Sequence, residues 1–212
     1  MIEKMRNMKL RSRMLLSYAV IIVICLIASI VALFMLNKIG DNLTSFYNNN
    51  YTVTVNVWQA KREMQAARAD ILNAILDSDA NKIEESIEEA KGSLKKMRGT
   101  FPVIRESFKG DLGLVDEVDS LLQQAIVYRD QVFERIEAGE HDEAYQIMKT
   151  YYIPLLDQMA NTLQDIADVA GENALHMVED GEHAQTSAMV TIILIIALSI
   201  LLAILFGLCI SN

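Results

Sequence analysis

Two apolar blocks without a single charged side chain stand near the ends of this 212-residue chain, at residues 14–36 and 188–210. Each block has 23 residues, and a helix of that length measures about 34 Å, more than the roughly 30 Å hydrocarbon core of a bilayer. The sequence therefore predicts two transmembrane helices. A secretory signal peptide is the alternative for the first block, but the block is longer than a signal core and only large residues end it.

The charges outside the blocks predict how the chain crosses the membrane. Residues 1–13 carry five Lys and Arg against one Glu, whereas residues 37–187 carry 27 Asp and Glu against 14 Lys and Arg. Basic flanks stay in the cytoplasm, so we expect a cytoplasmic leader at 1–13, an extracytoplasmic domain at 37–187 and both termini inside the plasma (inner) membrane. The leader also suits anionic membrane lipid. A concentrated basic face for nucleic acid is missing from the sequence.

Hydrophobic spacing between the two blocks predicts a helical bundle. The chain has 2 Pro and 9 Gly, and apolar residues recur at alternating intervals of three and four, as in packed helices. Short turns at 77–79, 109–113 and 138–140 separate four such stretches. We predict an all-α fold, an antiparallel four-helix bundle (up-down-up-down) whose first and last helices continue into the transmembrane helices. The first helix carries the stripe Val53, Val57, Ala60, Met64, Ala67, Ile71 and Ala74.

Two features of this pattern leave alternatives open. The small side chains of Ala60, Ala67 and Ala74 permit close approach of another helix, either inside one bundle or across a dimer. On the third helix, two choices of stripe place either Tyr128 or Arg129 inward.

The two prolines predict distortions of the helices that contain them. Proline has no N–H group to donate to the preceding turn, and its ring clashes with that turn. We expect a bend near Pro102 in the second helix. In the fourth helix, which is predicted to begin near Asp142, we expect a kink or a break at Pro154.

The chemistry expected of the chain is binding and not catalysis. The sequence contains no glycine-rich phosphate loop, nucleophile elbow or zinc motif. Its two cysteines, Cys25 and Cys209, lie in the apolar blocks and read as membrane-facing residues. His176 and His183 share a helical face, so a metal site there is the alternative. We predict no enzyme, no catalytic residue, no metal and no cofactor.

Polar and aromatic residues in the membrane-distal half of the bundle are candidates for a ligand site. Guanidinium groups and phenol hydroxyls suit a carboxylate or an aromatic acid. The alternative for each residue is ordinary structure, with Arg68 paired to Asp70 or a neighbour and the tyrosines packed with their hydroxyls at the rim. Tyr145 and Thr150 lie nearby, and the predicted ligand-binding residues are Arg68, Asn73, Tyr128, Arg129, Tyr151 and Tyr152.

At several places the chain resembles the transmembrane sensor half of methyl-accepting chemotaxis receptors. The likeness rests on residues 7–13 (NMKLRSR), 68–72 (RADIL), 138–144 (AGEHDEA) and 210–212 (ISN). The same input domain resembles that of some sensor kinases and cyclases. The resemblance implies a homodimer that binds a small ligand outside and shifts the last helix slightly against the first. It places Arg68 and residues 151–154 near the family's ligand site, although Met64, Ala69 and Asn73 stand where arginines are expected.

Three functions remain after these observations. The favoured one is a chemoreceptor input module that binds an amino acid, organic acid or aromatic acid and signals to a cytoplasmic module or kinase complex. The second is a module that binds a protein, such as a periplasmic binding protein, and the third is a structural membrane-anchored dimer. Residues 211–212 are expected to begin a cytoplasmic linker, and the chain to be either truncated or one half of a longer receptor.

Overall fold

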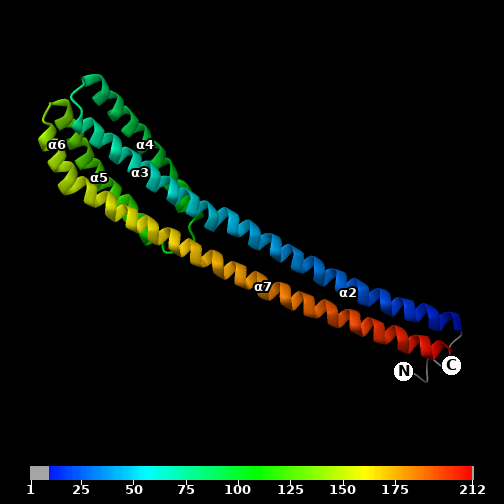
Figure 1. Ribbon diagram of the computed structural model, residues 1–212. Helices are drawn as coiled ribbons and strands as arrows, with labels where there is room; N and C mark the ends of the chain where they lie inside the picture. The colour runs from blue at the N-terminus through cyan, green and yellow to red at the C-terminus, as the bar shows by residue number, and fades with distance from the viewer. Residues whose placement is uncertain (1–9, 212) are drawn as a thin grey trace. The chain divides into compact units, whose positions relative to one another are not determined.

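The computed structural model describes residues 10–211, and all regular elements in this range are helices (Figure 1). The predicted leader falls largely on residues 1–9, which lie outside the described residues, as does Asn212. The elements are α2 (Leu10–Ser45), the π-helical turn η1 (Phe46–Tyr51), α3 (Thr52–Leu76), α4 (Ala80–Ser107), α5 (Leu112–Glu137), α6 (His141–Ile147), the π-helical turn η2 (Met148–Tyr152) and α7 (Ile153–Ser211). The predicted all-α class is confirmed.

The chain forms two compact units. One unit is the bundle, residues 45–176, and the other pairs residues 10–44 with residues 177–211. Helix α7, 59 residues long, belongs to both units without interruption.

Side-chain bonds give the directions of the helices in the bundle. Lys61 on α3 donates to Gln164 on α7 at 2.7 Å, and seven residues later Arg68 meets Asp157 at 3.4 Å. Because the partner's number falls as the α3 number rises, α3 and α7 are antiparallel. Arg105 near the end of α4 binds acidic side chains near the start of α5, so these helices form a hairpin. The predicted antiparallel four-helix bundle is confirmed.

The interior of the bundle follows the predicted stripes. Ala60, Ala67 and Ala74 are fully buried within a single chain, so these small residues serve packing inside the bundle. Helix α3 lies close against α4 along this surface, as small side chains allow. Buried residues from the other helices include Ile87, Leu94, Met97 and Ile104 of α4, Val118, Leu122 and Ala125 of α5, and Leu156, Met159, Leu163 and Ile166 of α7.

The turns between helices fall in the stretches that the sequence predicts, and side-chain caps begin two of the helices that follow. An Asp79 carboxylate oxygen accepts a hydrogen bond of 3.0 Å from the Asn81 amide at the start of α4. Asp111 likewise accepts from the Gly113 amide at the start of α5, at 2.9 Å. These caps satisfy amides that lack a partner inside the helix. Gly139, between α5 and α6, has a φ of 75°, a left-handed conformation that glycine adopts without strain.

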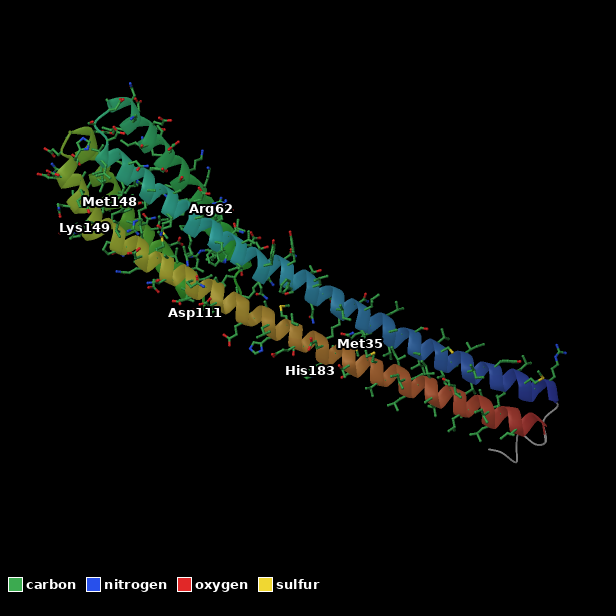
Figure 2. The ribbon with its side chains drawn as sticks, in the orientation of Figure 1. Met35, Arg62, Asp111, Met148, Lys149 and His183 are labelled. Carbon is green, nitrogen blue, oxygen red and sulfur yellow. The ribbon has the colours of Figure 1, made fainter. Side chains whose placement is uncertain are left out.

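The two prolines have different consequences. Pro102 lies inside α4, and the helix continues through it from Ala80 to Ser107 without a break. Pro154 is the second residue of α7 and lies two residues after the end of η2, the turn marked by Met148 and Lys149 in Figure 2. Proline offers no N–H to the preceding turn and crowds it. The helix thus passes Pro154 by widening into a π-helical turn, so the predicted distortion takes this form and not that of a break.

The second unit contains the two candidate membrane helices, which lie side by side (Figure 1). Each contains a window with mean hydropathy 3.2, long and apolar enough to cross a membrane, in which no residue is buried. Polar side chains here bond to their own helix: Ser29 donates to the Cys25 carbonyl and Thr191 to the Ser187 carbonyl. Internal pairing of this kind is what a hydrocarbon environment requires. Cys25 is a free, exposed thiol.

Candidate functional site

Two of the predicted ligand residues form an aromatic pair between α5 and η2. The rings of Tyr128 and Tyr151 are stacked, with centroids 4.9 Å apart and planes 7° from parallel. Tyr151 is about half exposed and Tyr128 is partly buried. The pair therefore presents a flat aromatic surface at the edge of the bundle and holds η2 against α5.

The neighbouring Tyr152 points into the bundle. It is 1% exposed, and burial raises the pKa of its hydroxyl to about 12, while the positive charges of Arg129 and Arg98 oppose this rise. Within residues 10–211, no side chain or backbone group forms a hydrogen bond with this hydroxyl. A buried polar group without a partner is rare and unfavourable, so the hydroxyl has an unused capacity to donate.

Arg129 lines the same small cavity as Tyr152. Its side chain is 17% exposed, and its Nε donates to a carboxylate oxygen of the adjacent Asp130 at 2.8 Å. The structure selects neither of the two alternative stripes on α5. Ala125 and Val132 are buried, and Tyr128 and Arg129, which lie between them in the sequence, are both partly buried.

A groove between α4 and α5 adjoins Arg129. It encloses about 350 Å³, within the usual range of small-molecule sites. Arg98, an exposed residue of α4, lines both this groove and a separate small cavity that Tyr152 also lines. The groove residues are Lys91, Leu94, Lys95, Arg98, Arg129, Asp130 and Phe133.

Arg68 lies in a different place, between α3 and α7. Its Nη1 is 3.4 Å from an Asp157 carboxylate oxygen, and both side chains are partly exposed. The expected local pairing with Asp70 is replaced by this pair across the bundle, because Arg68 reaches the antiparallel α7. Partial burial raises the pKa of Asp70 above its ordinary value.

Asn73 also lies apart from the tyrosines. It is exposed and lines a polar hollow of about 460 Å³ where α3 ends and α4 begins, together with Asp77, Lys82 and Glu85. Tyr145 and Thr150 are exposed. The structure thus brings Tyr128, Arg129, Tyr151 and Tyr152 together, and places Arg68 and Asn73 elsewhere.

Arg98 and Lys95 are the residues that sequence reasoning missed. Lys91, Lys95 and Arg98 follow one another at intervals of four and three, so they share a face of α4. Such a basic face is unusual in a segment with nearly twice as many acidic as basic residues. This spacing was the available signal, although it does not reveal which helix the face adjoins.

The outer face of η1 and α3 carries exposed apolar residues. Tyr47 and Tyr51 stack with ring centroids 5.4 Å apart, and Val55 and Trp58 continue the row at helical spacing. Lys61 Nζ lies 5.3 Å from the centroid of the Trp58 ring, a cation–π contact. We call Tyr47, Tyr51, Val55 and Trp58 the aromatic row.

The histidines of the described residues are not grouped with other metal-binding side chains into a metal site. Among residues 10–211, no three His, Cys, Asp or Glu side chains are grouped so as to hold a metal ion. His176 and His183 both lie on α7. His141 instead lies 2.8 Å from the Ile75 carbonyl oxygen through Nδ1, and so joins the start of α6 to the end of α3.

Comparison with known proteins gives one match. A family described as a four helix bundle sensory module for signal transduction matches residues 7–184, which is most of the chain. No curated protein and no solved structure matches.

Proposed function

Because the chain belongs to the four-helix-bundle sensory modules of methyl-accepting chemotaxis receptors, as its sequence predicts, we propose that it is the input part of a membrane chemoreceptor. The bundle binds a small organic ligand outside the cell. The two apolar helices cross the plasma membrane, with both termini in the cytoplasm. A cytoplasmic signalling module or kinase complex receives the signal.

The continuity of α7 is the observation that supports transmission. This helix runs unbroken from Ile153, next to Tyr152, through a window apolar enough to cross a membrane. A helix transmits a displacement along its axis because its hydrogen bonds keep its rise fixed. Interface helices in switching proteins move by about 1–2 Å. A ligand favours such a shift only if it binds the two positions with different affinity.

The aromatic row supports a homodimer. Tyr47, Tyr51, Val55 and Trp58 are large and exposed, although α3 buries its opposite stripe completely. Aromatic side chains are enriched in protein interfaces. In the proposed receptor, two copies of the bundle meet along this face of η1 and α3.

A chimaera tests the sensory function. The full chain is joined after Asn212 to the cytoplasmic module of a chemotaxis receptor, and kinase activity is measured against amino acids, organic acids and aromatic acids. We expect at least one compound to change kinase activity. Glu172→Pro, an exposed position inside α7, should abolish the response because proline interrupts the helix, whereas Glu172→Ala should preserve it. A full response in Glu172→Pro would contradict transmission along α7.

The same chimaera separates the alternatives. A sensor kinase or cyclase input domain would show the same binding with a different output module. A module that senses a binding protein would respond to no free compound in the panel. A structural dimer would respond to neither.

A further inference from the structure

The basic face of α4 contains two charges that the bundle does not neutralise. Lys91 binds Glu88 at 2.7 Å, and Arg105 binds Asp116 at 2.6 Å and Asp119 at 2.8 Å. Lys95 and Arg98, between them, have no carboxylate within ion-pair distance in the described part of the chain. Two unpaired cations in an acidic domain indicate a surface adapted to an anion.

These cations lie at the edge of the groove between α4 and α5. Lys91, Lys95 and Arg98 from α4 and Arg129 from α5 line it, against a single carboxylate, Asp130. Leu94 and Phe133 supply apolar surface to the same groove. The groove therefore has room, an excess of positive charge and a hydrophobic contact for the body of a small organic molecule.

A small cavity that shares lining residues with the groove adjoins a buried tyrosine. A cavity of about 10 Å³ shares Leu94, Arg98 and Arg129 with the groove, and Tyr152 lines it. That volume holds about one water-sized group. Tyr152 is 1% exposed and its hydroxyl has no hydrogen bond in the described chain, so the hydroxyl is available to a single oxygen atom placed there.

We propose that this groove binds a small organic dianion, with one anionic group held by Lys95, Arg98 and Arg129 and one of its oxygens accepting a hydrogen bond from Tyr152. Guanidinium groups donate to carboxylate and phosphate oxygens in matched pairs. A dicarboxylate and a phosphate ester share this chemistry. The proposal deepens the proposed sensory function, because it names the ligand class, but the binding step is tested without any signalling output.

The location connects binding to α7. Tyr152 ends η2 and directly precedes α7, while Lys95, Arg98 and Arg129 belong to α4 and α5. A dianion bound by all four residues links η2 to two other helices of the bundle. Binding thereby favours the position of η2 that brings the Tyr152 hydroxyl to the ligand.

Calorimetric titration of the full chain in detergent tests the site with two probes, succinate and inorganic phosphate. We expect saturable binding of at least one probe. Arg98→Gln should weaken it at least about tenfold, the effect of losing one charged hydrogen bond. Lys96→Gln, a neighbouring exposed residue outside the groove, should change affinity by less than about twofold. Succinamide, which has the shape of succinate without its charges, should not bind.

The outcomes separate the possibilities. Binding of succinate alone supports a dicarboxylate, of phosphate alone a phosphoryl group, and of both a general dianion. Tyr152→Phe should lower affinity while the protein stays folded; unchanged affinity would mean that only water occupies the cavity and would overturn the assigned role of Tyr152. Absence of binding by both probes, or equal effects of Arg98→Gln and Lys96→Gln, would overturn the site.

The result is independent of the chimaera. Binding of a dianion, together with no kinase response to any compound of the panel, would refute the sensory function and leave the site standing. Conversely, kinase responses that persist in Arg98→Gln would retain the sensory function and refute this groove as its ligand site.

Discussion

Replacement of Ala67 by leucine tests whether α3 packs inside one chain as described. Ala67 is fully buried, like Ala60 and Ala74 seven residues to either side. The isopropyl group that leucine adds at this position has to enter the space between α3 and its neighbours. Because protein interiors are already close-packed, the helices must move apart or the new side chain must adopt a strained rotamer.

The expected destabilisation is about 1–3 kcal/mol, the usual cost of inserting methylene groups into a packed core. In a chain of this size, 1 kcal/mol lowers the melting temperature by about 2–4 °C. We therefore expect the bundle of Ala67→Leu to melt about 2–12 °C below the parent protein. Far-UV circular dichroism of the full chain in detergent, recorded at several protein concentrations, measures this difference.

Ala69 provides the matched control, because it is exposed on the same helix. Ala69→Leu should change stability by no more than about 0.5 kcal/mol. Equal melting temperatures for the two variants would refute the burial of Ala67 in the bundle. A shift in Ala67→Leu that grows or vanishes with protein concentration would instead place Ala67 between two chains.

Three further variants probe other features. Asp79→Ala removes the cap of α4 and should cost about 0.5–2 kcal/mol in thermal unfolding, with the exposed Ser78→Ala as control; equal effects of the two would contradict the cap. Gly110→Ala places a Cβ against the Phe108 ring and 2.8 Å from Cγ1 of Val169. We expect this clash to destabilise the bundle by about 1–3 kcal/mol in thermal unfolding. An unchanged melting temperature would show that the Phe108 and Val169 side chains move aside without cost. Because burial raises the Tyr152 pKa from 10.0 to about 12, the folded state holds this proton more tightly. Its contribution to stability is complete below pH 10 and is lost as the pH rises toward 12. Tyr152→Phe should reduce that alkaline loss in melting temperature, and an identical pH profile would contradict it.

The repeated pattern made the bundle predictable. The stripe from Val53 to Ala74 places an apolar residue on one face of α3 at every turn, and a face of that regularity has to be buried in a water-soluble domain. Asp79 and Asp111 cap the starts of α4 and α5 through a local hydrogen bond, because each carboxylate accepts from the amide two residues later in the sequence. Such information is contained in a short stretch of sequence.

The candidate site depends on contacts that a single stretch does not encode. Periodicity shows which face of α4 carries Arg98, but the register of α4 against α5 and η2 decides that Arg98 adjoins Arg129 and Tyr152. The pair of Arg68 with Asp157, 89 residues away, depends in the same way on the register of α3 and α7. The π-helical turn before Pro154 locally changes the register of this last helix against its neighbours. The sequence predicts that the helix is distorted near Pro154, but it does not predict a π-helical turn.

Trp58 makes the aromatic row observable by intrinsic fluorescence. It is the single tryptophan of the chain and is 58% exposed, with the Lys61 ammonium over its ring. Its fluorescence therefore reports on one face of α3 without a label, against the weaker emission of 7 tyrosines. Water around the indole keeps the emission at long wavelength and open to dissolved quenchers, and a second protein surface laid over it would reverse both properties.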